Sequence, residues 1–299
     1  MIDAAIQAMA YAALISAVAG SPEGAQDGSS RGCRVHVPRH VHGAASGGFR
    51  GGIFAGRRGV SDRLAAVTDP VRYRLEGTTA IVEMDDGKAN ALSDAMIDAV
   101  ISALDRAEGE ARAMVLAGRA DRFCAGFDLR VMMSGPDNAR ALLRRGSELL
   151  LRLYAAKVPL VIACTGHALA GGALVVLTGD VRIAAAGAYR IGLNEVAIGL
   201  PVPVLAMELA RDRLLPTALT RATLLAHIHG PEEARAAGYV DEVVAVEQVV
   251  PRALEEAAKL AELGRVPFQA TKQRLRGRTI AYIRESMEAD LLALLAPAE

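Results

Sequence analysis

The sequence predicts an α/β fold in which the strands pair largely in parallel. Three short apolar runs of strand length lie at 79–83 (TAIVE), 113–116 (AMVL) and 158–164 (VPLVIAC). A helical pattern follows each run, and strands that alternate with helices are typical of a parallel sheet covered by helices. The chain has 299 residues, of which 52% are apolar, so it can bury a large core.

The first two helices are predicted from apolar spacing and from signals at their ends. The first begins after Ser93, whose side chain can cap it, and ends near Gly109. Its apolar face consists of Met96, Ile97, Val100, Ile101 and Leu104. The second helix spans 136–154 and has a proline in its first turn, where proline is well tolerated.

The later part of the chain is mostly helical. Residues 171–179 (GGALVVLTG) are apolar on all sides, which predicts a buried helix. After Pro231 the helical pattern continues to the end of the chain. We therefore expect a core over 67–230 and a helical C-terminal region over 231–299, packed on that core.

The first 66 residues differ from the rest in composition. Residues 4–19 are apolar, but they are too few for a comfortable membrane span and lack the positive start of a secretory signal. Residues 20–58 contain 10 of the 29 glycines. Three of the six histidines also lie there: His36, His40 and His42. We expect 1–66 to be a disordered or weakly ordered extension whose histidines are solvated rather than metal-bound.

Charge and cysteine content exclude several classes of partner. The 34 Lys and Arg residues balance the 34 Asp and Glu residues, which leaves no broad charged surface for nucleic acid or for an anionic membrane. Cys33, Cys124 and Cys164 lie far apart and form no CxxC motif. This pattern argues against a disulfide framework and a structural zinc site, and it favours the reducing cytoplasm.

Two glycine-containing stretches are candidates for binding a negatively charged oxygen. Residues 166–172 (GHALAGG) do not match GxGxxG, and the chain has no GxxxxGK[ST] motif, so nucleotide binding is not supported. This stretch places Gly171 and Gly172 at the start of a buried helix, where free N–H groups attract anions. A second loop at 123–129 (FCAGFDL) is similarly rich in small residues. Two such loops meeting at one carbonyl oxygen would form an oxyanion hole, although glycines also serve close helix packing.

Short motifs occur in a distinctive order at 90–92 (NAL), 125–128 (AGFD), 168–172 (ALAGG), 180–183 (DVRI) and 199–201 (GLP). In this order and spacing they resemble the crotonase superfamily, also called the enoyl-CoA hydratase/isomerase family, from about residue 71 to the C-terminus. The resemblance implies a spiral of repeated ββα units with a helical C-terminal region, assembled as homotrimers or dimers of trimers. It also implies an acyl-CoA thioester as the ligand.

The resemblance further implies which residues hold the thioester. The thioester oxygen is expected to accept hydrogen bonds from the backbone amides of Phe127 and Gly171. The Phe127 side chain, in place of a commoner small residue, is expected to line or narrow the acyl pocket. The loop that begins at Lys88 is expected to meet CoA through its backbone, with Lys88 or Arg130 near phosphate. The other expected substrate-binding residues are Ala89, Ala91, Ala125, Asp128, Leu129 and Gly172.

The acidic residues distinguish activities within the family. The hydratases that this chain resembles carry two glutamates, whereas here Leu174 occupies the first position and Glu195 the second. This combination resembles the Δ3,Δ2-enoyl-CoA isomerases. Moving the double bond requires removal of a proton beside the thioester carbonyl and its return two carbons along, and one carboxylate can do both. The apolar neighbours of Glu195 predict a raised pKa for its carboxyl group.

The expected activity is therefore the conversion of a 3-enoyl-CoA to a 2-enoyl-CoA in fatty acid oxidation. Two alternatives stay open. One is an enoyl-CoA hydratase that works with one glutamate. The other is an acyl-CoA-binding protein without catalysis, for which Leu174 is the motivating feature.

The other chemically reactive residues are expected to lie outside the reaction. Asp180 should lie at the wrong end of the buried helix, Cys124 should be an inert buried thiol, and His167 is more often structural than catalytic in such a position. His227 and His229 are expected to be peripheral. No metal or redox cofactor is implied.

Overall fold

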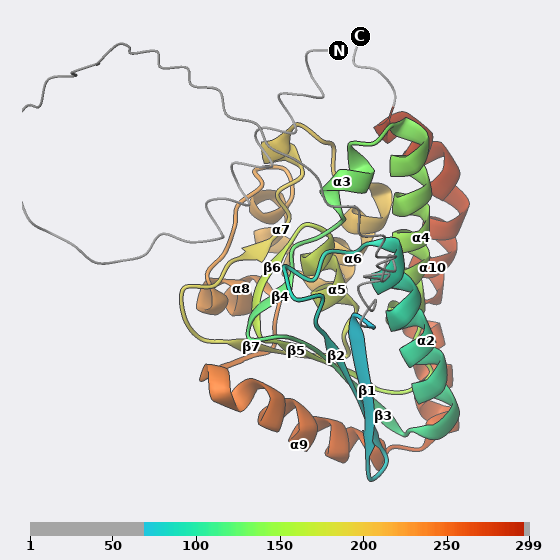
Figure 1. Cartoon of the computed structure of the whole chain (residues 1–299), viewed down its shortest axis with the longest axis vertical. Helices are drawn as coiled ribbons and strands as arrows, with labels where there is room; N and C mark the ends of the chain where they lie inside the picture. Colours follow the sequence, from blue (N-terminus) through green and yellow to red (C-terminus); the bar gives the residue numbers. More distant parts are fainter. Residues whose placement is uncertain (1–68, 296–299) are drawn as a thin grey trace, which may run out of the picture. The chain divides into compact units, whose positions relative to one another are not determined.

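The structure is a computed structural model that describes residues 69–295 (Figure 1). The extension expected over 1–66 lies outside the described residues, and the boundaries expected near residues 67 and 231 stay predictions. Within the described part, no helix combines the length and the apolar character that crossing a membrane would require.

The larger of two sheets contains the strands that the apolar runs predict. β2 (Thr79–Met84), β3 (Ala113–Gly118) and β5 (Leu160–Cys164) are neighbours and pair in parallel. β7 (Val181–Ala185) and β9 (Glu242–Val244) extend the sheet beyond β5, again in parallel. The α/β fold with largely parallel pairing is thus confirmed.

β7 and β9 were not predicted from the sequence, and the other strands that were not predicted are polar or very short. β1 (Val71–Glu76) lies at the edge of the larger sheet and forms an antiparallel hairpin with β2. The smaller sheet consists of β4 (Asp121–Cys124), β6 (Gly166–Leu169) and β8 (Ile191–Gly192), paired in parallel. Strands of two to four residues contain too few positions for an alternating pattern to be recognised.

Alternate residues of the larger sheet face two different cores. Met114 and Leu116 of β3 belong to the main core, whereas Val115 and Ala117 belong to a second core formed with α9 (Val249–Ala261). In Figure 1, α9 crosses one face of the sheet. Because both faces are covered, the strands read as continuous apolar runs rather than as an alternation of polar and apolar residues.

The helices predicted before residue 180 are present. α2 (Asp94–Glu110) begins after Ser93, whose Oγ accepts a hydrogen bond from the Met96 amide at 3.3 Å. α4 (Pro136–Tyr154) starts with the proline, and α5 (Gly171–Thr178) is buried along its whole length. A short helix, α3 (Leu129–Met132), separates the first two.

The C-terminal region is helical, as expected. After α6 (Val204–Arg213) and α7 (Pro216–Ala222), the chain forms α8 (Pro231–Ala237), then β9, α9 and finally α10 (Arg265–Leu294). α10 is 30 residues long and packs against α4 and α6. It therefore covers the helical layer that contains the buried α5.

Candidate active site

The three strands of the smaller sheet end at one common edge. β4, β6 and β8 lie side by side and run in the same direction. The turn after β4 carries Phe127, the turn after β6 carries Gly171, and the turn after β8 carries Glu195. Carboxyl ends of neighbouring parallel strands meet at the same edge of a sheet, where ligands bind in many α/β folds. The fold thus brings together the three residues expected to act on the thioester.

The two glycine turns are in direct contact. A Cβ atom at Gly126 would lie 3.1 Å from the carbonyl oxygen of Leu169 and 3.3 Å from the amide nitrogen of Gly171. A Cβ atom at Gly172 would collide with the carbonyl oxygen of Cys124. Glycine at 172 therefore permits a backbone-to-backbone approach that a side chain would prevent, and at Gly126 a side chain would be tightly packed.

Both turns expose backbone amides. Gly126 has a φ of 95°, and Ala170 adopts a φ of 48°, a conformation that residues with a Cβ seldom take. A residue other than glycine in such a conformation, as at Ala170, costs about 1–3 kcal/mol, and such residues cluster at functional sites. In the part of the chain that the structure describes, neither the Phe127 amide nor the Gly171 amide donates a hydrogen bond to another backbone group. Both N–H groups can therefore serve an anionic oxygen, as an oxyanion hole requires.

The ring of Phe127 occupies space left by two glycines. A Cβ atom at Gly146 in α4 would collide with the ring, and one at Gly171 would lie 3.2 Å from it. The ring borders an apolar pocket between α4, α5, α6 and α10, and Leu174 borders the same pocket. Its wall also includes Leu143, Leu150, Leu205, Ile283, Met287 and Leu291. The side chain of Phe127 thus lines a pocket next to its own amide.

Glu195 is a buried carboxylate without a charged partner among residues 69–295. It immediately precedes the short 3₁₀ helix η1 (Val196–Ile198), and only 7% of its surface is exposed. Its Oε2 atom forms no hydrogen bond in the described part of the chain. Burial raises the pKa of Glu195 from 4.5 to about 7, against the effect of its own backbone amide, which lowers it. The raised pKa that the apolar neighbours predict is thus present.

Two further buried polar side chains belong to the surroundings of Glu195. The side-chain amide of Asn194 has no partner on either its oxygen or its nitrogen within the described residues. The Tyr239 hydroxyl also lacks a partner there. Burial raises the pKa of Tyr239, and the charge of Glu195 adds to that rise. Neither residue was predicted from the sequence. Asn194 adjoins Glu195 but was given no role, and Tyr239 comes near Glu195 only through the fold.

Asn90 shapes the loop expected to meet CoA. It is fully buried and adopts a φ of 52°, a left-handed conformation that asparagine tolerates better than most residues. Its Nδ2 atom donates to the carbonyl oxygens of Met84, Arg122 and Phe123 at 2.9–3.2 Å. The role of Asn90 was not predicted. The signal for it in the sequence was that asparagine adopts a left-handed conformation more readily than most residues.

The loop is also fixed by Asp86 and by the oxyanion turn. The Asp86 carboxylate accepts hydrogen bonds from the amides of Lys88 at 2.7 Å and Asn90 at 2.9 Å. The Ala125 amide donates to the carbonyl oxygen of Ala89 at 3.1 Å. Lys88, Ala89 and Ala91 therefore lie on a hydrogen-bonded loop beside Ala125, and their expected contact with CoA stays a prediction.

Asp128 braces the start of α3. Its carboxylate accepts a hydrogen bond from the Arg130 amide at 2.9 Å and pairs with the Arg130 guanidinium at 3.0 Å. Hydrogen bonding to Arg130 holds the pKa of Asp128 below its ordinary value. Arg130 is thus paired in this structure, and Leu129 begins the helix that Asp128 caps.

The contacts of His167 and the burial of Cys124 indicate structural rather than catalytic roles. His167 Nδ1 accepts a hydrogen bond from the Arg190 amide at 3.1 Å, and its ring meets Tyr189 edge to face. Burial, followed by the charges of two arginines, lowers its pKa. Burial raises the pKa of the Cys124 thiol to about 12, which keeps it protonated and unreactive at neutral pH.

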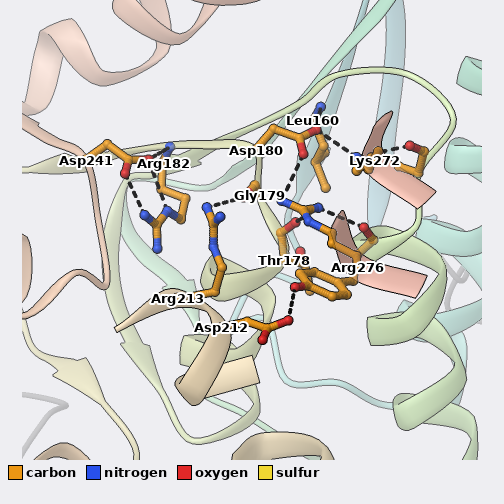
Figure 2. A network of polar contacts seen from close by, with 12 residues as sticks. Leu160, Thr178, Gly179, Asp180, Arg182, Asp212, Arg213, Asp241, Lys272 and Arg276 are labelled. Atoms are coloured by element: carbon orange, nitrogen blue, oxygen red, sulfur yellow. Dashed lines mark hydrogen bonds and ion pairs between the residues drawn. The ribbon is translucent and has the colours of Figure 1, made fainter. Parts of the chain in front are cut away.

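Asp180 lies at the opposite end of α5 from Gly171, where its distance along the chain places it. Its carboxylate accepts a hydrogen bond from the Leu160 amide at 2.8 Å and pairs with Lys272 at 2.7 Å and Arg276 at 3.0 Å (Figure 2). Both cations belong to α10. Asp180 thus fastens α10 to the core and takes no part in the edge that carries Glu195.

Comparison with known proteins agrees with this geometry. Residues 74–293 match the family Enoyl-CoA hydratase/isomerase. The chain is 31% identical to rat mitochondrial enoyl-CoA delta isomerase 1 over 251 residues, which cover 81% of this chain and 87% of the relative. It is 34% identical to a probable enoyl-CoA hydratase of Rhodobacter capsulatus over 211 residues, which cover 68% of this chain and 79% of the relative.

Solved structures share the fold. The apo structure of an enoyl-CoA isomerase of Mycobacterium tuberculosis aligns with a TM-score of 0.72 at 42% identity, and the alignment covers 75% of this chain and 98% of that chain. The matched region contains both glycine turns, Glu195 and α10. The chain therefore belongs to the enoyl-CoA hydratase/isomerase family and is an enzyme with the crotonase fold.

Proposed function

We propose that the protein is a Δ3,Δ2-enoyl-CoA isomerase, which converts a 3-enoyl-CoA to the conjugated 2-enoyl-CoA. The observation that carries this proposal is the carboxylate of Glu195, which is buried and has no partner at Oε2 within the described residues. Leu174 occupies the first of the two acid positions and lines an apolar pocket. Similarity to named enoyl-CoA isomerases supports the same activity.

In the proposed reaction the thioester oxygen accepts hydrogen bonds from the amides of Phe127 and Gly171. The ionised carboxylate of Glu195 removes a proton from C2, and the electron pair of that C–H bond forms a dienolate whose negative oxygen faces the two amides. The same carboxyl group then returns the proton to C4, which leaves the double bond between C2 and C3. A group with a pKa of about 7 suits both steps, because it loses and regains a proton readily near neutral pH.

The surroundings of Glu195 also favour the intermediate. Burial disfavours the charged carboxylate, so the acid is relatively stable in its neutral form while the dienolate exists. The developing charge then lies on the thioester oxygen, where hydrogen-bond donors preorganised in a dry site stabilise it most. The charge therefore moves from an unpartnered carboxylate to a partnered oxygen.

The proposed ligand is an acyl-CoA thioester, and the proposed reaction uses neither a metal ion nor a redox cofactor. The loop with Lys88, Ala89 and Ala91 would contact the CoA portion, and Ala125, Asp128, Leu129 and Gly172 are the other proposed substrate-binding residues. Assembly as a homotrimer or a dimer of trimers and a cytoplasmic location stay predictions.

A hydratase is the second candidate, because the Rhodobacter capsulatus relative is named a probable enoyl-CoA hydratase. Hydration needs one group to orient water and another to deliver a proton. In this chain the first of these positions is the buried, apolar Leu174. A hydratase would have to perform both tasks with Glu195 alone.

Separate assays with 3-enoyl-CoA and 2-enoyl-CoA test the proposal. With 3-enoyl-CoA we expect the ultraviolet absorbance of the conjugated thioester to rise, and with 2-enoyl-CoA we expect it to stay constant. Glu195→Gln should lower kcat by about 10²- to 10⁴-fold, as for the loss of a general acid–base, while acyl-CoA binding is retained. The exposed Glu262→Gln is the matched control and should keep full activity.

The other outcomes identify the alternatives. Rapid loss of absorbance with 2-enoyl-CoA would make the protein a hydratase. Tight acyl-CoA binding without turnover of either substrate, unaffected by Glu195→Gln, would make it a binding protein.

A further inference from the structure

Three potential metal ligands meet outside the proposed active site. His227 and His229 lie between α7 and α8, and Glu233 lies in the first turn of α8. One ligand atom from each residue lies within 4.8 Å of the other two. Among residues 69–295, no other group of three or more His, Cys, Asp or Glu side chains converges in this way.

Backbone pairing explains why the two histidines meet. The His229 backbone exchanges two hydrogen bonds of 2.9 Å with Ile191, so this segment pairs with β8. Residues two apart in an extended segment point to the same side. The two imidazole rings accordingly meet edge to face, with centroids 4.6 Å apart. The chain then turns into α8, which brings Glu233 Oε1 to 2.8 Å from His227 Nε2.

His229 is the residue that points to a ligand. It is only 2% exposed, and its Nδ1 atom makes no hydrogen bond of normal length and angle within the described residues. A buried polar atom without a partner is expensive, and most such atoms in proteins are satisfied by protein, water or an ion. Imidazole nitrogen is also the commonest metal ligand among protein side chains.

A cation already lies in the cluster. The Arg221 guanidinium is 3.1 Å from His227 Nε2 and 3.4 Å from Glu233 Oε1. Its side chain is 59% exposed, and exposed ion pairs contribute only about 0–1 kcal/mol. Arg221 can therefore leave the cluster at little cost, and a metal ion would replace one positive charge with another.

We propose that His227, His229 and Glu233 form a binding site for one divalent transition-metal ion of the zinc type. Two imidazoles and one carboxylate are a common zinc ligand set, with water in the fourth position. Bonds of about 2.0–2.1 Å in a tetrahedral site bring ligand atoms to about 3.4 Å from one another. The ligands must close in from 4.8 Å, and the partly exposed side chains of His227 and Glu233 have the freedom to do so.

The bound ion would fasten the start of α8 to the strand that leads to Glu195. His229 pairs with Ile191 in β8, and its ring lies 5.2 Å from that of Tyr239. The charge of Glu195 in turn contributes to the raised pKa of Tyr239. The ion would thus stabilise the segments that position Glu195. It would neither contact the acyl-CoA nor take part in proton transfer.

Metal binding to the full chain tests this inference independently of turnover. Cys33, His36, His40 and His42 are first replaced by alanine, so that the extension offers no competing ligands. Metal-free protein is then titrated with Zn²⁺ by calorimetry and with Co²⁺ by visible absorption. We expect one equivalent of Zn²⁺ per chain and the visible bands of four-coordinate Co²⁺, which Zn²⁺ abolishes. Absence of saturable binding would overturn the proposal.

Variants locate the site. His227→Ala and Glu233→Gln should each weaken Zn²⁺ binding by at least about 10-fold, and both residues are exposed enough to be replaced without unfolding. Arg221→Ala should strengthen binding, because it removes the competing cation. His167→Ala, which changes a half-buried histidine outside the cluster, is the matched control and should bind as the parent does. Unchanged binding in His227→Ala and Glu233→Gln would refute the site, and so would weaker binding in Arg221→Ala.

Discussion

The carboxylates of Glu195 and Asp180 are both largely withdrawn from solvent, and their surroundings differ completely. Glu195 has no charged partner among residues 69–295, and burial raises its pKa to about 7. Asp180 has two cationic partners, Lys272 and Arg276, and also accepts a hydrogen bond from a backbone amide (Figure 2). Burial alone therefore does not mark a reactive acid. The absence of a partner does, because an isolated carboxylate can change its charge at neutral pH.

The ion network around Asp180 holds the far end of α5. Arg213 donates to the carbonyl oxygen of Gly179 at 2.8 Å, and Arg276 donates to that of Tyr154 at 2.8 Å (Figure 2). Cations near the C-terminus of a helix interact favourably with its dipole. The network thus fixes the helix whose N-terminus carries the Gly171 amide, while Glu195 is left without such support.

The largest expected effect on stability comes from removing the partnered acid. Asp180→Ala leaves Lys272 and Arg276 buried without their counter-charge, and breaking a buried ion pair costs about 3–5 kcal/mol. Urea unfolding at pH 7 measures the loss. Asp137→Ala, at a side chain that is 92% exposed, is the matched control and should change stability by less than about 0.5 kcal/mol. A loss of less than about 1 kcal/mol in Asp180→Ala would contradict the assigned anchoring role.

Glu195→Gln should have the opposite effect on stability. The pKa of Glu195 is raised from 4.5 to about 7, so the folded state favours the protonated acid. This contribution is fully present below pH 4.5 and is lost as the pH rises through about 7. At pH 8 the variant should therefore be more stable than the parent by about 2–3 kcal/mol. Urea unfolding at pH 8 and pH 5 measures the difference in unfolding free energy between variant and parent. A difference that is not smaller at pH 5 than at pH 8 would show that the buried charge of Glu195 is not its cause.

The rate should follow the ionisation of the same group. The proposed base acts in its charged form, so kcat/KM for 3-enoyl-CoA should be constant above a pH of about 7 and should fall about tenfold per pH unit below it. A pH profile between 5 and 9 provides the measurement. A profile without a break near 7 would mean that another group limits the reaction.

The smallest effect is expected at Lys272. Burial lowers the pKa of Lys272 to about 8, despite the favourable charge of Asp180, so the folded protein holds this cation at a cost. In Lys272→Met the alkyl stem is kept and Asp180 retains Arg276. Because Asp180 keeps Arg276, no buried charge is left unpaired, and the loss should be that of the Lys272 hydrogen bonds, about 1 kcal/mol. A loss as large as that of Asp180→Ala, again by urea unfolding, would show that the two cations are not redundant.

The sequence alone predicts the long elements and the chemistry of Glu195. The helices α2 and α4 repeat an apolar spacing over many residues, and β3 is an uninterrupted apolar run. Apolar neighbours in sequence predict the raised pKa of Glu195, because several of them remain its neighbours in the fold. The oxyanion role expected for the Phe127 and Gly171 amides, and the position of Leu174, rest on motif order and resemblance and stay predictions.

The remaining features depend on contacts between distant parts of the chain. β8 spans only Ile191–Gly192, and its pairing with His229 is what creates the histidine cluster. Lys272 and Arg276 lie on α10, far in sequence from Asp180, and nothing in the helical pattern predicts that they point inward. His227 and His229 were predicted to be peripheral. Their possible role as metal ligands becomes apparent only when the fold places Glu233 beside them.

The helix α10 carries its anchoring residues and its pocket-lining residues in different halves. Its first half carries the cationic anchors Lys272 and Arg276, and its second half supplies Met287 and Leu291 to the wall beside Phe127. A mutant library restricted to Met287 and Leu291 would vary the pocket beside Phe127, which is the acyl pocket expected from the sequence, while the anchors stay untouched. Directed evolution of chain-length preference should therefore start at these two positions.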